Sequence, residues 1–132
     1  MSSYATVAEF NVHGIRPEAI PPAIVDADKI AAIEAASLVA DSYLSSQFHM
    51  PIITWGTDLT RAVCAIAAYE LVASLLVFQP DPATNQVLTD RAESARSWLK
   101  DISAGRARPN VVDTAPSAKT ASRVFSKPPR GW

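Results

Sequence analysis

The segment from Asp58 to Phe78 is apolar on nearly every side when it is drawn as a helix. A helix without a polar face has to be buried, so this segment predicts a central helix surrounded by others. Thr57 can cap its start, and Gln79-Pro80-Asp81-Pro82 would end it. Its longest apolar run, Ala62 to Phe78, is interrupted by Glu70 and Ser74 and is shorter than the roughly 20 residues that cross a membrane. Its small residues permit close helix packing: Ala62, Ala65, Ala67, Ala68 and Ala73.

A short helix is predicted to begin at Thr6, because Thr6-Val-Ala-Glu9 is a capping box. Gly14 can end this helix in a left-handed conformation. A second helix is expected from about Ala27 to Phe48, with Asp26 as its N-cap. Residues at helical spacing predict its apolar face: Ile30, Ile33, Ser37, Ala40, Leu44 and Phe48. Leu38 and Val39 lie off that face, where they would pack on another element or on a neighbouring subunit.

A further helix is expected over roughly Thr84 to Ala104, with Trp98 at the edge of its apolar face and Gly105 as its C-terminal cap. That face is predicted to contain Leu88, Ala92, Ala95, Leu99 and Ile102. The fold class expected is therefore all-α: a small bundle of about three main helices plus a short N-terminal helix. Residues 1–105 would form this helical domain.

Residues 106–132 contain four prolines and show no helical periodicity, which predicts an extended C-terminal tail. The net charge changes at the same place. Residues 1–105 contain 6 Lys and Arg against 12 Asp and Glu, whereas residues 106–132 contain 6 against 1. A basic tail of this kind can touch nucleic-acid phosphates, can be merely solvated, or can dock on a partner. Phe125 and Trp132 favour docking, because aromatic residues and Arg are common interface anchors.

No catalytic constellation is found, so we expect neither an enzyme nor a bound cofactor or metal. His13 and His49 have no Cys, His or acidic neighbour at ligand spacing. Cys64 is the one cysteine and lies in the most apolar segment, which indicates an inert thiol and a reducing compartment. The start of the chain lacks the pattern of a secretion signal.

Asp41 falls on the apolar face of the second predicted helix, beside Ser37 and Leu44. A carboxylate there needs a partner, because burying an unpaired charge is costly. Arg61, near the start of the third predicted helix, is the first cation we would test. Asp41 could act as a general acid or base, but we prefer the interpretation that it forms a structural ion pair or hydrogen bond.

Several short pieces, in order along the chain, resemble the small connector proteins encoded among the head-morphogenesis genes of Mu-like prophages and related tailed phages. The matching pieces are Tyr4-Ala-Thr6, Asp41-Ser-Tyr-Leu44, Met50-Pro51-Ile52, Ala67, Tyr69, Trp98-Leu99, Ile102, Gly105, Arg123-Val-Phe-Ser126 and Arg130-Gly131-Trp132. The chain departs from that pattern at Gln47-Phe48, where the family often has Arg-Tyr. It departs again at Pro128-Pro129, where an acidic residue and a leucine are usual.

The resemblance implies a head–tail adaptor located in the neck of the virion, after assembly in the host cytoplasm. Such subunits form a ring, commonly of twelve, beneath the portal, with a stopper or tail-terminator protein below. Genomic DNA would pass through the channel without specific binding, and no membrane is involved. The residues expected to bind the portal or a neighbouring subunit are Arg123, Val124, Phe125, Arg130, Gly131 and Trp132. A tail-completion or stopper protein, and a small helical nucleic-acid-binding module, are the alternatives.

Overall fold

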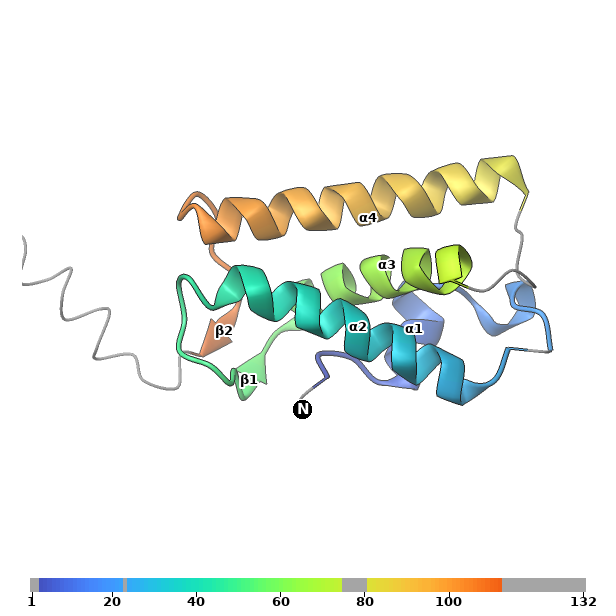
Figure 1. The fold of residues 1–132 in the computed structure, drawn as a ribbon, viewed down its shortest axis with the longest axis horizontal. Helices are drawn as coiled ribbons and strands as arrows, with labels where there is room; N and C mark the ends of the chain where they lie inside the picture. The colour runs from blue at the N-terminus through green and yellow to red at the C-terminus, as the bar shows by residue number, and fades with distance from the viewer. Residues whose placement is uncertain (1–2, 23, 75–80, 113–132) are drawn as a thin grey trace, which may run out of the picture.

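The central element of the fold is α3 (Thr57–Ser74), which packs against α1 (Val7–His13), α2 (Asp26–Leu44) and α4 (Pro82–Ser103) (Figure 1). The structure is a computed structural model that describes residues 3–22, 24–74 and 81–112. A short 3-10 helix, Pro17–Ala19, joins α1 to α2. Two short strands, β1 (Thr54–Trp55) and β2 (Val111–Val112), complete the described elements.

The predicted all-α bundle is confirmed, and α3 is its buried helix as expected. The apolar residues of α3 that the sequence placed in the centre are almost fully covered: Leu59, Ala62, Val63, Cys64, Ile66, Ala67, Ala68 and Leu71. The predicted end of this helix at Phe78, together with Gln79 and Pro80, lies outside the described residues.

The apolar face predicted for α4 is confirmed residue by residue. Its buried residues are Leu88, Ala92, Ala95, Leu99 and Ile102, and Trp98 lies half-buried at the edge. Asp81 caps the start of the helix by accepting a hydrogen bond from the backbone N–H of Thr84. A regular 3.6-residue pattern of this kind identifies the buried face, because one stripe is apolar and the rest is polar.

The apolar face predicted for α2 is confirmed at Ile33, Ser37, Ala40, Leu44 and Phe48, which are all buried, and the prediction was wrong at Ile30 and at the end of the helix. The helix begins at Asp26 and ends at Leu44, so Phe48 lies beyond it, although its side chain is still buried. Ile30 was predicted to face the core, but 46% of its surface is exposed. Lys29 is buried instead, and its Nζ donates a hydrogen bond to Asn11 Oδ1 at 3.1 Å. Alanines on several sides of this helix leave the direction of its core face ambiguous in the sequence.

The capping box at Thr6 and Glu9 is present as predicted, but Gly14 differs from the expectation. Gly14 has a φ of −97°, which is outside the left-handed region. A Cβ at this position would lie 2.9 Å from the ring of Phe10, which is fully buried. Glycine is therefore required here because the turn passes close to the Phe10 ring.

Candidate functional site

The end of α4 turns the chain back toward the bundle through a Schellman motif. Gly105, at φ +83°, donates its backbone N–H to Ile102 O at 3.0 Å. Arg106 donates its backbone N–H to Asp101 O at 2.7 Å, and its guanidinium lies 2.9 Å from Asp101 Oδ1. The glycine cap predicted from the sequence is confirmed. After this cap, residues 106–112 turn back along the bundle toward β1 rather than away from it.

Residues 109–112, which we call the arm base, attach the chain to β1 and to the first turn of α3. β2 pairs with β1 in antiparallel register, with Thr54 opposite Val112 and Trp55 opposite Val111. The backbone N–H of Asn110 donates to Asp58 Oδ2 at 2.8 Å. Pro109 is buried. These residues were expected to begin the tail, yet they are part of the folded unit, which therefore extends to Val112.

Gly56 allows this attachment because it lies directly against the arm base. A Cβ on Gly56 would approach Asn110 Nδ2 to 2.7 Å, closer than side-chain carbons come to other atoms. The chain thus leaves the described body at a fixed point beside β1. We call residues 113–132 the arm. They lie outside the described residues, and so do the six residues predicted to bind a partner: Arg123, Val124, Phe125, Arg130, Gly131 and Trp132.

Asp41 accepts its hydrogen bond from the hydroxyl of Tyr4, not from Arg61 as the sequence suggested. Burial raises the pKa of the Asp41 carboxyl, and the Tyr4 hydrogen bond opposes that rise. Burial, with the neighbouring carboxylate, also raises the pKa of the Tyr4 hydroxyl. The carboxyl is therefore held by a neutral phenol inside the fold. Arg61 was the wrong partner because it lies on the side of α3 that faces α1 and α4, whereas Asp41 belongs to α2.

Tyr4 joins the N-terminal segment to three parts of the bundle. Its backbone N–H donates to Ser37 Oγ at 3.1 Å, and its carbonyl accepts from Thr60 Oγ1 at 2.9 Å. Its ring meets the ring of Trp55 edge-on at 4.8 Å between centroids. The Tyr4–Asp41 contact is thus one part of a buried polar network that fixes the N-terminal segment against α2 and α3.

We expect Asp41→Ala to lower the free energy of unfolding by about 1–3 kcal/mol, because it leaves the buried Tyr4 hydroxyl without an acceptor. Asp41→Asn should cost less, since its side-chain carbonyl still accepts. Urea denaturation measures both, with the exposed Glu93→Ala as a control expected within about 0.5 kcal/mol of the wild type. If both Asp41 variants keep full stability while assembly fails, Asp41 acts at an interface instead.

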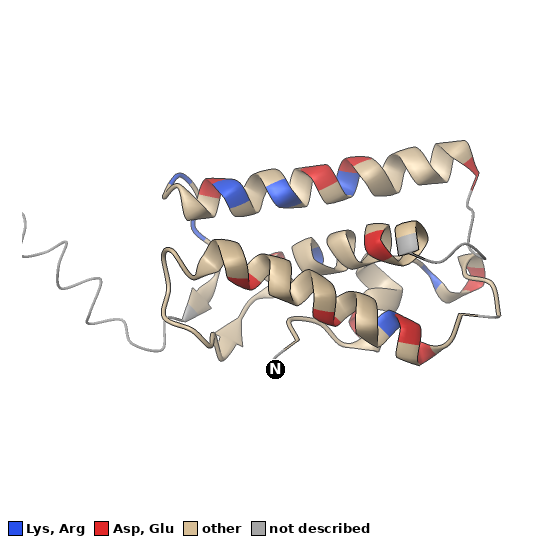
Figure 2. Cartoon of the chain, viewed as in Figure 1, with Lys and Arg blue, Asp and Glu red and all other residues tan. Residues whose placement is uncertain are grey.

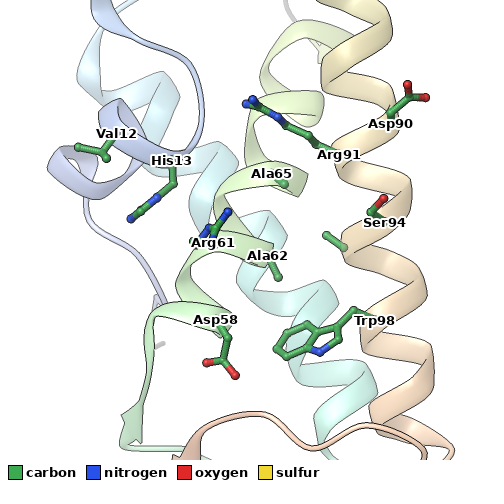
Figure 3. Close-up of a pocket in the computed structure, with 11 residues that line it drawn as sticks. Val12, His13, Asp58, Arg61, Ala62, Ala65, Asp90, Arg91, Ser94 and Trp98 are labelled. Carbon is green, nitrogen blue, oxygen red and sulfur yellow. The ribbon is translucent and has the colours of Figure 1, made fainter.

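A groove of about 600 Å³ lies between the end of α1, the outer surface of α3 and α4 (Figure 3). It brings Arg61 of α3 beside His13 of α1, and Arg91 and Trp98 of α4 line the opposite wall. No sequence pattern predicts this groove, because its residues come from three separate helices and share no periodicity.

Two aspartates and two arginines line the groove, and the aspartates accept hydrogen bonds from neutral amides, which leave their negative charges in place. Asp58 accepts from Asn110, and Asp90 accepts from the side-chain amide of Gln86 at 2.8 Å. Arg61 and Arg91 make no ion pair or hydrogen bond with any residue in the ranges that the structure describes. Two unpaired guanidinium groups beside apolar walls can bind a carboxylate carried by another molecule.

The described residues offer little for covalent chemistry. Cys64 is fully buried, and burial raises the pKa of its thiol to about 12, so the thiolate is scarce near neutral pH. Within ranges 3–22, 24–74 and 81–112, no three or more His, Cys, Asp or Glu residues gather as metal ligands. Over the same ranges, no helix has the length and apolar character needed to span a bilayer.

The chain matches the family model described as Bacteriophage Mu, Gp36 over residues 11–127. That match covers most of the sequence, and the chain belongs to this bacteriophage protein family. Membership indicates a role in phage structure or morphogenesis. No curated protein matches the chain significantly. The match runs from within α1 through the arm base and into the arm, so it includes residues of both the body and the arm.

Proposed function

We propose that this protein is a non-enzymatic head–tail adaptor of a tailed phage, forming a ring, of about twelve copies as the resemblance implies, beneath the portal. The proposal is supported by the phage family and by the attachment of the arm at a fixed point on a small helical body. The arm base carries this argument: an arm that fastens two proteins has to be secured to its own body. β2 and the Asn110–Asp58 hydrogen bond provide that attachment.

The arm contains the residues that would fasten the subunit to the portal or to a neighbouring copy. Phe125 and Trp132 supply aromatic anchors, and Arg123 and Arg130 supply cations for acidic groups. Cations alone would give weak attachment that salt screens, so the aromatic rings carry most of the affinity. A stopper or tail-terminator protein would bind on the tail side of the ring.

The net charge of the body suits a channel through which DNA passes. With the boundary at Val112, residues 1–112 contain 8 Lys and Arg against 12 Asp and Glu, a net charge of −4. An acidic body repels phosphate and does not hold duplex DNA. Salt-sensitive DNA binding by the full chain would favour the alternative, a small helical nucleic-acid-binding module.

Changing Phe125 and Trp132 together to alanine should abolish incorporation of the protein into heads and prevent tail joining. The measurement is immunoblotting of purified heads together with counting of tailed particles by electron microscopy. Lys119→Ala, also in the arm but without an aromatic ring, is the matched control and should leave incorporation intact. Normal incorporation and tail joining after deletion of residues 123–132 would eliminate the fastening role.

A further inference from the structure

The groove between α1, α3 and α4 has the lining of a site for an aromatic ring. Ala62, Ala65 and Ala95 give it small apolar walls, and the half-buried indole of Trp98 forms part of one side (Figure 3). Its volume of about 600 Å³ lies in the range of cavities that hold a ligand. Small side chains beside an indole favour an aromatic occupant, because paired rings attract each other in addition to burying apolar surface.

Charge does not distinguish between the possible occupants of the groove. Asp58 and Asp90 line it together with Arg61 and Arg91, so it offers partners to groups of either sign. Figure 2 shows acidic and basic residues along α4, and charged residues also on α2. The occupant is therefore determined by which apolar group the chain brings close to the groove.

The arm begins beside this groove. Asp58 lines the groove and accepts the backbone N–H of Asn110 at 2.8 Å, and the arm starts directly after Val112. Figure 3 shows the segment after α4 running past Asp58 at the end of the groove. From Asn110 to Val112 the chain can extend at most about 7 Å, so the first residue of the arm starts close to a residue that lines the groove.

The length of the arm suits the distance to be covered. Phe125 is the first aromatic residue of the arm and follows Val112 by 13 positions. Residues 113–122 consist of Ala, Ser, Thr, Pro, Asp and Lys, which is the composition of a linker. A linker of this length has a root-mean-square span of roughly 20 Å. Along α4 the groove extends from Asp90 to Trp98, which is about 12 Å at 1.5 Å per residue, so Phe125 reaches all of it.

We infer that Phe125, within the segment Arg123–Lys127, docks in the groove of its own subunit before assembly. A segment tethered so close to a site is present there at an effective concentration in the mM range, whereas a second free copy is present only at the concentration of the protein. The tether therefore favours the arm of the same chain over a second copy. The inference goes beyond the adaptor function, because it concerns the isolated subunit, where docking keeps Phe125 away from other partners.

Disulfide trapping in the full-length chain tests this docking. Cys64 is the one native cysteine and is buried, so cysteines introduced at exposed sites are the ones that diamide oxidises. Ser126→Cys, beside Phe125, combined with Ser94→Cys in the groove should form a disulfide within one chain at least ten times faster than Ser126→Cys combined with Glu93→Cys. Glu93 is the matched control, because it is the neighbouring residue of α4, is exposed and does not line the groove.

The ring itself is tested in the Ser94→Cys, Ser126→Cys background. Phe125→Ala should remove the tenfold preference, whereas Lys119→Ala should keep it, and circular dichroism checks that every variant folds. Equal rates for the Ser94 and Glu93 pairs, or a preference that survives Phe125→Ala, would overturn the proposal. A mixture of ¹⁵N-labelled and unlabelled chains identifies the occupant. A disulfide mainly between labelled and unlabelled chains at micromolar protein means that a second copy supplies the arm, which also overturns the proposal.

Incorporation into heads separates this docking from the adaptor function. The oxidised form, with its arm held in the groove, should enter heads only after reduction. If it enters heads as well as the reduced form while the tenfold preference is present, the docking is supported and the fastening role of Phe125 is contradicted. If the preference is absent but Phe125→Ala with Trp132→Ala abolishes incorporation, the docking is contradicted and the fastening role is supported.

Discussion

A fragment that ends at residue 105 should unfold at a temperature at least about 10 °C lower than a fragment that ends at residue 112. The shorter fragment lacks β2, the buried Pro109 and the hydrogen bond from Asn110 to Asp58. Each hydrogen bond contributes about 1 kcal/mol and each buried apolar side chain about 1.5–3 kcal/mol, so the loss is on the order of 3 kcal/mol. In a domain of this size, that loss lowers the melting temperature by roughly 10 °C or more.

The measurement is thermal unfolding of both fragments by circular dichroism at 222 nm, the helix signal. The 1–112 fragment should unfold in one cooperative transition. Equal melting temperatures would show that the arm base contributes nothing to the fold and that the body ends at Gly105, as the helical periodicity alone predicts. Asp58→Ala in the 1–112 fragment removes the hydrogen bond to Asn110, together with the one that Asp58 Oδ1 accepts from the backbone N–H of Leu59, and should account for about 1–2 kcal/mol of the difference.

Leu99→Ala should lower the free energy of unfolding by about 2–5 kcal/mol. Leu99 is fully buried on the face of α4 that packs on α3 and α2, so the smaller side chain leaves a cavity between the three helices. Urea denaturation measures the change. Val87→Ala on the same helix, where the valine is 47% exposed, should change stability by less than about 0.5 kcal/mol. A cost below about 1 kcal/mol for Leu99→Ala would mean that α4 is not packed as described.

A helix face could be predicted from the sequence to the extent that its apolar residues are distinct from their neighbours. In α4, apolar residues recur at helical spacing among charged ones, so its face was predicted correctly. In α2, five of the six residues predicted for the apolar face are buried and Leu38 lies off that face as predicted, but Ile30 is exposed, because alanines on several sides leave the edge of the face ambiguous. The same ambiguity is informative, because it marks a helix with two apolar surfaces.

Contacts between residues that are far apart along the chain could not be predicted from the sequence alone. Tyr4 and Asp41 are separated by 37 positions, and no local pattern pairs a phenol with that carboxyl. β2 has two residues, too few for a strand pattern to be detected. The groove combines residues of α1, α3 and α4, so it exists only once those helices pack.

The pairing of β2 with β1 determines where a mechanical load enters the protein. When tension is applied along the arm, the first bonds to carry it are those of the strand pair and of Asn110 with Asp58. The force then passes into β1 and the start of α3, the central helix, and it reaches the end of α4 only after those bonds break. Rupture at the arm base would therefore release residues 106–112 as slack while the four helices remain packed.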